Sequence, residues 1–86
     1  MGKNFLIEGN ICGERVKVAR VVRSMTQDDL AREVNLQGMD MTKIIVSRIE
    51  SNQRHVCDAE LKMLAKVLGV SMEWLCGDGE ILLGGR

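Results

Sequence analysis

The most reactive side chains in the sequence belong to cysteines and to one histidine, residue types that hold zinc in many proteins. Cys12, Cys57 and Cys76 are scattered, without the Cys-x-x-Cys pair typical of a zinc site, and His55 is the single histidine. Reduced thiols behave as small apolar side chains. We therefore expect the cysteines to be free in a reducing compartment, with no metal site and no cofactor.

Motifs typical of catalytic sites are also missing from the sequence. It has no H-E-x-x-H, no G-x-S-x-G, no phosphate-binding loop and no dinucleotide fingerprint. The glycines at positions 77, 79, 84 and 85 have no helix after them, so they predict a flexible C-terminal tail over residues 77–86. We expect neither an enzyme nor a binding site for a small-molecule ligand.

Basic side chains are concentrated in the middle of a chain whose net charge is zero. Residues 15–54 carry eight basic and five acidic residues, whereas residues 56–86 carry three and five. A local basic region can form the electrostatic footprint of a nucleic-acid-binding surface even in a neutral protein. The uneven charge therefore keeps nucleic acid open as a partner.

The composition predicts that helices position these side chains. Proline is absent, aromatic residues are limited to Phe5 and Trp74, and 45% of the 86 residues are hydrophobic. Such a chain can form one modest all-α core, filled by aliphatic side chains and methionine. It has no run of roughly 18 apolar residues, as a membrane helix needs, and no secretory signal pattern at its N-terminus. We expect a soluble, cytoplasmic protein without a membrane partner.

Apolar spacing and capping residues predict five short helices. They are expected over residues 13–25, 27–35, 43–51 and 59–68, with a last helix that starts at Ser71 and contains Met72, Trp74 and Leu75. The expected N-terminal caps are Thr26, Thr42, Asp58 and Ser71, and the expected helix ends are Asn52 and Gly69. The positions expected to face the core are Leu30, Ala31, Val34, Val46, Ile49, Glu50, Leu61, Leu64, Ala65 and Leu68. Together the helices form one domain over residues 13–76, after a lead-in over residues 1–12, and Trp74 is expected to close one end of its core.

The first helix carries two apolar stripes, although a helix of a single small domain normally shows one. One stripe contains Val16, Ala19, Arg20 and Arg23, and the other contains Val18, Val21, Val22 and Met25. The second stripe implies cover from the lead-in or from another subunit. Two candidate dimer surfaces follow, one at Val18 and Val22 and the other at Trp74, Leu75, Ile81, Leu82 and Leu83. The sequence does not choose between them.

Four short sequence pieces follow one another in an order that is more specific than any one of them. They are Gly13-Glu14-Arg15-Val16 with Arg20, Thr26-Gln27-Asp28-Asp29-Leu30-Ala31, Ser47-Arg48-Ile49-Glu50, and Leu68-Gly69-Val70-Ser71 preceded by Glu60-Leu61 and Ala65. Together they resemble the phage repressor/Cro-like helix-turn-helix (XRE) family over about residues 13–76. The resemblance implies a compact five-helix, repressor-like DNA-binding domain.

The sequence departs from the family pattern in two places. The segment between Ala31 and Ser47 is several residues longer than the commonest spacing, with the excess at residues 37–41, so the turn becomes a loop. In addition, Lys43 is followed by the apolar residues 44–46 at the start of the third helix, where family members often have polar side chains. We expect the helix pair to be kept, because the cap and the buried face of the third helix are still present.

The resemblance also implies roles for individual residues. The implied base contacts are Lys43, Ile44, Ser47 and Arg48, the implied phosphate contacts are Gln27, Thr42 and Arg54, and the implied structural ion pair joins Arg20 to Glu50. The alternative for the basic base contacts is a solvated helix face, and Gln27 could be a surface residue that supports the cap. Ile44 could pack on a thymine methyl or against the long loop.

These roles imply a sequence-specific transcriptional regulator that acts on double-stranded DNA. It would be a repressor that binds a palindromic operator as a homodimer, through the helix at residues 43–51. The alternative is a protein-protein interaction module, such as an antitoxin-like protein, that uses the apolar surface Ile44–Val46. Acidic residues at positions 28, 29 and 40, near the expected DNA face, keep this alternative open.

Overall fold

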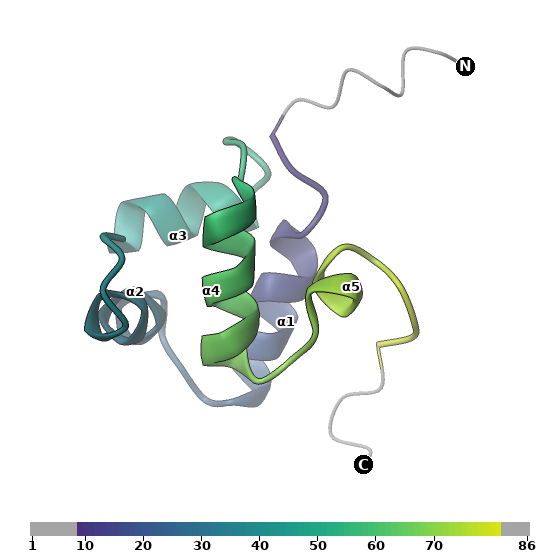
Figure 1. The fold of residues 1–86 in the computed structure, drawn as a ribbon, viewed down its shortest axis with the longest axis horizontal. Coiled ribbons are helices and arrows are strands. Elements are labelled where there is room, and N and C mark those ends of the chain that lie inside the picture. Colours follow the sequence, from purple (N-terminus) through teal and green to yellow (C-terminus); the bar gives the residue numbers. More distant parts are fainter. Residues whose placement is uncertain (1–8, 82–86) are drawn as a thin grey trace.

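The computed structural model describes residues 9–81, and all the regular secondary structure in this part is helical (Figure 1). The helices are α1 (Gly13–Val22), α2 (Gln27–Leu36), α3 (Lys43–Glu50), α4 (Asp58–Leu68) and α5 (Met72–Leu75). The predicted all-α fold with five helices is therefore confirmed. Within the described range, no helix has the length and apolar character needed to cross a membrane.

The core is mainly aliphatic and lies between the five helices. α1 contacts α3, α4 and α5, and α2 contacts α3 and α4. The largest side chains with no more than trace exposure are Val16, Leu30, Val34, Val46, Ile49, Leu64, Leu68 and Leu75. Every helix contributes at least one of them, so burial of apolar area fixes the helices against one another.

Side-chain caps define the starts of most helices. The Thr26 hydroxyl accepts a hydrogen bond from the Asp29 N–H (2.9 Å), and the Asp29 carboxylate accepts one from the Thr26 N–H (2.8 Å). This reciprocal box satisfies two N–H groups at the start of α2 and lowers the pKa of Asp29. Thr42 and Ser71 cap α3 and α5 in the predicted way.

The predicted cap of α4 is wrong by one residue. Cys57 has the extended conformation of an N-cap, and Asp58 is the first helical residue. The Glu60 carboxylate accepts a hydrogen bond from the Cys57 N–H (3.1 Å), and this bond compensates for the weak cap that a thiol provides. The Glu60 carboxylate, three residues after the N-cap Cys57, therefore marks the start of α4.

Three helices end at a residue whose backbone adopts the left-handed conformation. α1 stops at Val22 and not at Met25, because Ser24 has φ +59° and the Met25 N–H turns back to the Arg20 carbonyl (3.0 Å). Asn52 (φ +66°) and Gly69 (φ +71°) end α3 and α4, as predicted. Only glycine and a few polar residues adopt this conformation readily, which makes such ends visible in a sequence.

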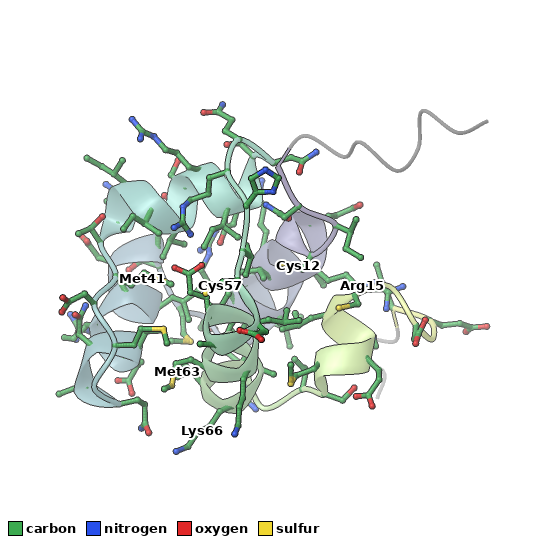
Figure 2. The ribbon with its side chains drawn as sticks, turned by 45° about the horizontal axis from the view of Figure 1, so that its top comes forward. Cys12, Arg15, Met41, Cys57, Met63 and Lys66 are labelled. Carbon is green, nitrogen blue, oxygen red and sulfur yellow. The ribbon has the colours of Figure 1, made fainter. Side chains whose placement is uncertain are left out.

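The lengthened loop between α2 and α3 is held by Asn35 and Met41. The Asn35 amide donates to the carbonyls of Ala31 (2.8 Å) and Met41 (2.5 Å) and accepts from the Met41 N–H (3.3 Å). Met41 is only 3% exposed and adds its side chain to the core between α2 and α3 (Figure 2). The helix pair is therefore kept, and the loop that joins it has its own anchor.

The two stripes of α1 have different surroundings. On the first stripe, Arg23 leaves the core and donates from Nε to the Leu68 carbonyl (2.5 Å), whereas the other three members are buried. On the second stripe, Val21 and Val22 are 56% and 50% exposed, so the described residues do not cover them. The lead-in over residues 1–12 was expected to cover this stripe, and its residues 1–8 lie outside the described residues.

The start of the predicted tail is attached to the helical domain. Arg15 donates to the carbonyls of Trp74 (3.0 Å), Asp78 (3.2 Å) and Gly79 (2.7 Å), and its guanidinium lies 4.9 Å from the centre of the Trp74 ring. The Trp74 indole N–H donates to the Glu80 carbonyl (2.9 Å). Trp74 thus packs at the edge of the core, as expected, and also holds the chain that follows α5.

The second candidate dimer surface is corrected at one position. Leu75 is 0% exposed and belongs to the core, so it is not available to a partner. Ile81 is 44% exposed, and Leu82 and Leu83 lie outside the described residues.

Candidate nucleic-acid interface

α3 separates buried from exposed side chains along its whole length. Val46 and Ile49 are 1% and 0% exposed and pack into the core. The opposite face carries the implied base contacts, all exposed: Lys43, Ile44, Ser47 and Arg48. Helical periodicity brings these positions to one side, over the first two turns of the helix. Within residues 9–81, neither basic side chain of this face takes part in an ion pair, so both can bind another molecule.

The implied phosphate contacts Gln27 and Thr42 lie at the N-terminal ends of α2 and α3. The Thr42 hydroxyl accepts from the Ile45 N–H (3.1 Å), and its side chain is exposed. Gln27 donates through Nε2 to Glu50 Oε1 (3.1 Å), which leaves a second N–H on the same nitrogen. The partial positive charge of a helix N-terminus favours a phosphate at such positions.

Arg20 and Glu50 form a largely buried ion pair between α1 and α3. Arg20 Nε lies 2.6 Å from Glu50 Oε2, and Nη2 lies 3.0 Å from Oε1. The third donor, Nη1, reaches the Met25 carbonyl (2.7 Å), and the hydrogen bond with Glu50 raises the pKa of Arg20. The side chains are 11% and 4% exposed, so the fork geometry fixes α3 relative to α1.

Arg54, the third implied phosphate contact, is engaged with α4. Its Nη1 and Nη2 lie 3.1 and 3.3 Å from the two carboxylate oxygens of Glu60, and its side chain is 33% exposed. Burial raises the pKa of Glu60, but the hydrogen bonds from Arg54 and from the Cys57 N–H outweigh this effect and lower it. A phosphate would have to share Arg54 with this carboxylate.

Asn10 is a positioning residue that the sequence analysis missed. Its Oδ1 accepts from the N–H groups of Cys12 (3.0 Å) and Gly13 (2.7 Å) at the start of α1. Its Nδ2 donates to the carbonyls of Ile49 (3.1 Å) and Arg54 (2.9 Å) at and beyond the end of α3. The only signal in the sequence is an asparagine shortly before a helix, a position where this residue type often caps.

The junction of α1 and α3 is close enough to require a glycine. A Cβ at Gly13 would overlap the carbonyl oxygen of Ile49. The N-terminus of α1 thus meets the C-terminal carbonyls of α3, and the partial charges of the two helix ends attract each other. This contact, the ion pair and Asn10 together hold the last turn of α3.

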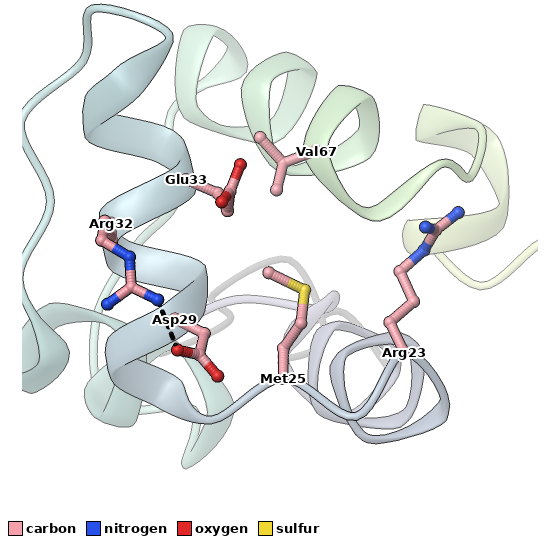
Figure 3. A pocket seen from close by; sticks show the side chains of 6 residues that line it. All are labelled: Arg23, Met25, Asp29, Arg32, Glu33 and Val67. Carbon is pink, nitrogen blue, oxygen red and sulfur yellow. Dashed lines mark hydrogen bonds and ion pairs between the residues drawn. The ribbon is translucent and has the colours of Figure 1, made fainter.

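A cleft of about 460 Å³ lies away from α3, between the segment that joins α1 to α2, α2 itself and α4 (Figure 3). It is lined by Arg23, Met25, Asp29, Arg32, Glu33 and Val67, and one ion pair crosses its wall, from Arg32 to Asp29 (2.7 Å). The lining mixes both signs of charge and includes none of the implied DNA contacts. We assign it no role in DNA binding.

The cysteines are free and do not form a metal centre in the described part of the chain. Cys12 is buried, and desolvation raises the pKa of its thiol, whereas Cys57 is exposed (Figure 2). No group of three or more His, Cys, Asp or Glu side chains within residues 9–81 could hold a metal ion.

Comparison with known proteins agrees with this geometry. A family model described as helix-turn-helix matches residues 16–75, which run from the first turn of α1 to the end of α5. No curated protein matches the chain. The matched region contains α2, α3 and the ion pair that fixes α3 relative to α1. The chain belongs to the XRE-type helix-turn-helix family and is a DNA-binding regulator of that type.

Proposed function

We propose that α3 enters the major groove of an operator and reads its base sequence. The observation that carries this proposal is the uncommitted face of α3, where two basic side chains, a hydroxyl and an exposed isoleucine follow one another at helical spacing. Lys43 and Arg48 would donate to guanine O6 and N7, and Ile44 would pack against a thymine methyl. Ser47 could donate to a base or accept from one.

Phosphate contacts would fix the register of α3 in the groove. Thr42 and the second N–H of Gln27 are suited to this role because both lie at helix N-termini. Arg54 would contact a phosphate through the exposed part of its side chain while it keeps its ion pair with Glu60. These contacts carry no sequence information, so they would strengthen binding to all duplexes alike.

A homodimer on a palindromic operator would supply the affinity that a single α3 lacks. One copy offers a handful of base contacts, and a second copy doubles them at a half-site roughly 34 Å away. The exposed valines at positions 21 and 22 support a contact between copies. Repression follows from occupancy, because a bound dimer excludes other proteins from the same stretch of DNA.

Selection from a random duplex pool, combined with affinity measured across salt concentrations, tests this proposal. We expect an enriched sequence with two-fold symmetry and an affinity that falls steeply as salt rises, since phosphate contacts release counterions. A response that is almost flat with salt, together with no enriched sequence, would contradict the proposal. Sedimentation of the protein with the selected duplex would give the number of bound copies.

A protein-protein interaction module is the second candidate, because two large apolar side chains are exposed at the ends of the lengthened loop. Leu36 is 71% exposed and Ile44 is 62% exposed. The apolar surface predicted over Ile44–Val46 is smaller in the structure, since Val46 is buried. An Ile44→Ser variant separates the candidates. Altered base preference at one operator position favours DNA reading, and unaltered DNA binding favours a protein partner.

A further inference from the structure

A cleft of about 290 Å³ lies beside the exposed face of α3 and opens between three helices. Its lining residues are Lys17, Arg20, Gln27, Ser47, Glu50 and Ser51, from α1, the first residue of α2, and the end of α3 with its cap. Ser47 also belongs to the implied base-reading face. The cleft is therefore continuous with the surface that would lie against DNA.

Lys17 occupies the side of α1 that faces α3. The spacing from Gly13 to Lys17 and from Lys17 to Arg20 is one helical turn, so the three positions share one stripe. Gly13 abuts the Ile49 carbonyl, and Arg20 pairs with Glu50, which places both ends of this stripe against α3. Lys17 lies between them, is exposed, and forms no ion pair within residues 9–81.

The other charges of the cleft are already paired. Glu50 accepts from Arg20 on both oxygens and from Gln27 on Oε1, so its negative charge is compensated. Glu14, which lies one turn before Lys17 on α1, lines the adjacent cleft and not this one. Lys17 consequently supplies the uncompensated positive charge of the cleft.

Neutral donors surround this charge. One N–H of the Gln27 amide is left after its bond to Glu50, and the exposed Ser47 hydroxyl adds a second donor. The Ser51 hydroxyl donates to the Ser47 carbonyl (2.9 Å) and presents lone pairs only. An anion that accepts several hydrogen bonds at once matches this lining, and a cleft of about 290 Å³ admits one phosphate group.

We propose that this cleft binds a phosphodiester of the DNA backbone and that Lys17 is its principal cation. The inference rests on the proposed function and adds a phosphate contact from α1, outside the helix pair. Contact from α1 would fix the rotation of the whole domain about α3, because α1 is joined to the end of α3 by Arg20 and Gly13.

The test compares Lys17→Gln with Lys66→Gln in binding to a random-sequence DNA duplex and to the selected operator. Lys66 is a matched control, since it is an exposed lysine in the last turn of α4, away from the α3 end of that helix (Figure 2). For Lys17→Gln we expect affinity to fall several-fold at low salt, and the slope of log affinity against log salt to become shallower by about one unit. Base preference should not change, and Lys66→Gln should match the wild type.

A conservative variant separates charge from packing. Lys17→Arg keeps the cation, so it should keep the slope of the wild type, and the free energy of unfolding should be similar in all variants because both lysines are exposed. A Lys17→Gln slope equal to that of the wild type would overturn the inference and leave the proposed function intact. A wild-type protein without salt-dependent binding would overturn both.

Discussion

The two ends of α3 differ in how firmly they are held, and under the proposed function this difference would help a short helix to recognise DNA. At its C-terminal end, Ile49 is buried, Glu50 is paired with Arg20, and the Ile49 carbonyl accepts from Asn10. At its N-terminal end, Thr42 provides a cap, and the side chains of the first turns are exposed except where they enter the core. One end is anchored, and the other is free to bind.

This asymmetry has a physical advantage for recognition. Side chains that already make hydrogen bonds within the protein must break them before they contact a base, whereas solvated side chains only exchange water. A helix whose position varies would lose affinity to the entropy of ordering it. Anchoring one end of α3 would therefore reduce the cost of binding without using the donors that are proposed to read the sequence.

Breaking the ion pair should have the largest effect on the anchored end. We expect Arg20→Met to lower the free energy of unfolding by about 3–5 kcal/mol, because Glu50 would be left buried without its partner. Chemical denaturation measures the loss. A double variant, Arg20→Met with Glu50→Leu, should recover most of the stability. A single variant as stable as the wild type would show that the pair does not anchor α3.

Substitution on the exposed face of α3 should change DNA recognition and leave stability unchanged. We expect Arg48→Ala to lose about 1–3 kcal/mol of discrimination at one base pair of the selected operator. Arg48→Lys should lose discrimination as well, because it lacks the planar fork, but it should keep the salt dependence. Competition binding with single-base operator variants measures both. Unchanged preference in Arg48→Ala would remove Arg48 from the reading face.

Loss of the Asn10 side chain should give a smaller effect on the anchored end. We expect Asn10→Ala to cost about 1–2 kcal/mol of stability, since four hydrogen bonds of its amide are lost and replaced in part by water. Asn10→Asp keeps the acceptor for α1 but cannot donate to the Ile49 and Arg54 carbonyls. An aspartate variant as stable as the wild type would show that the link to α3 is unimportant.

The smallest effect on stability is expected from acid, which should weaken the ion pair between Arg54 and Glu60 of α4. The pKa of Glu60 is lowered in the folded state, so its contribution to stability is present above the pKa of the unfolded chain and is lost as pH falls through the folded pKa. Glu60→Gln should cost at most about 1 kcal/mol near neutral pH. It should also lose less stability than the wild type on acidification.

A matched variant controls for the general effect of charge in that experiment. Glu73 is exposed on α5 and has no ion pair within residues 9–81. We expect Glu73→Gln to follow the wild type as the pH falls. Equal acid sensitivity in Glu60→Gln and in the wild type would contradict the role of Glu60.

The sequence alone determined the features that depend on neighbouring residues. Caps such as Thr26 and Thr42 need one hydroxyl and a nearby N–H, and the left-handed ends at Asn52 and Gly69 need one permissive residue. The resemblance of the ordered sequence pieces to the family predicted the helix pair, with one buried and one exposed face on α3. Asp58 was misplaced because the actual cap, Cys57, is a residue type that rarely caps.

Only the tertiary structure decided which side chains are occupied and which are free. Arg54 is a basic residue after α3 in the sequence, and its pairing with Glu60 depends on how α4 packs. Asn10 gains its role because the start of α1 meets the end of α3, and Lys17 becomes the open cation of a cleft for the same reason. Such contacts join residues far apart in the chain. Their distances depend on how the helices pack around the shared core, and no local sequence pattern encodes that packing.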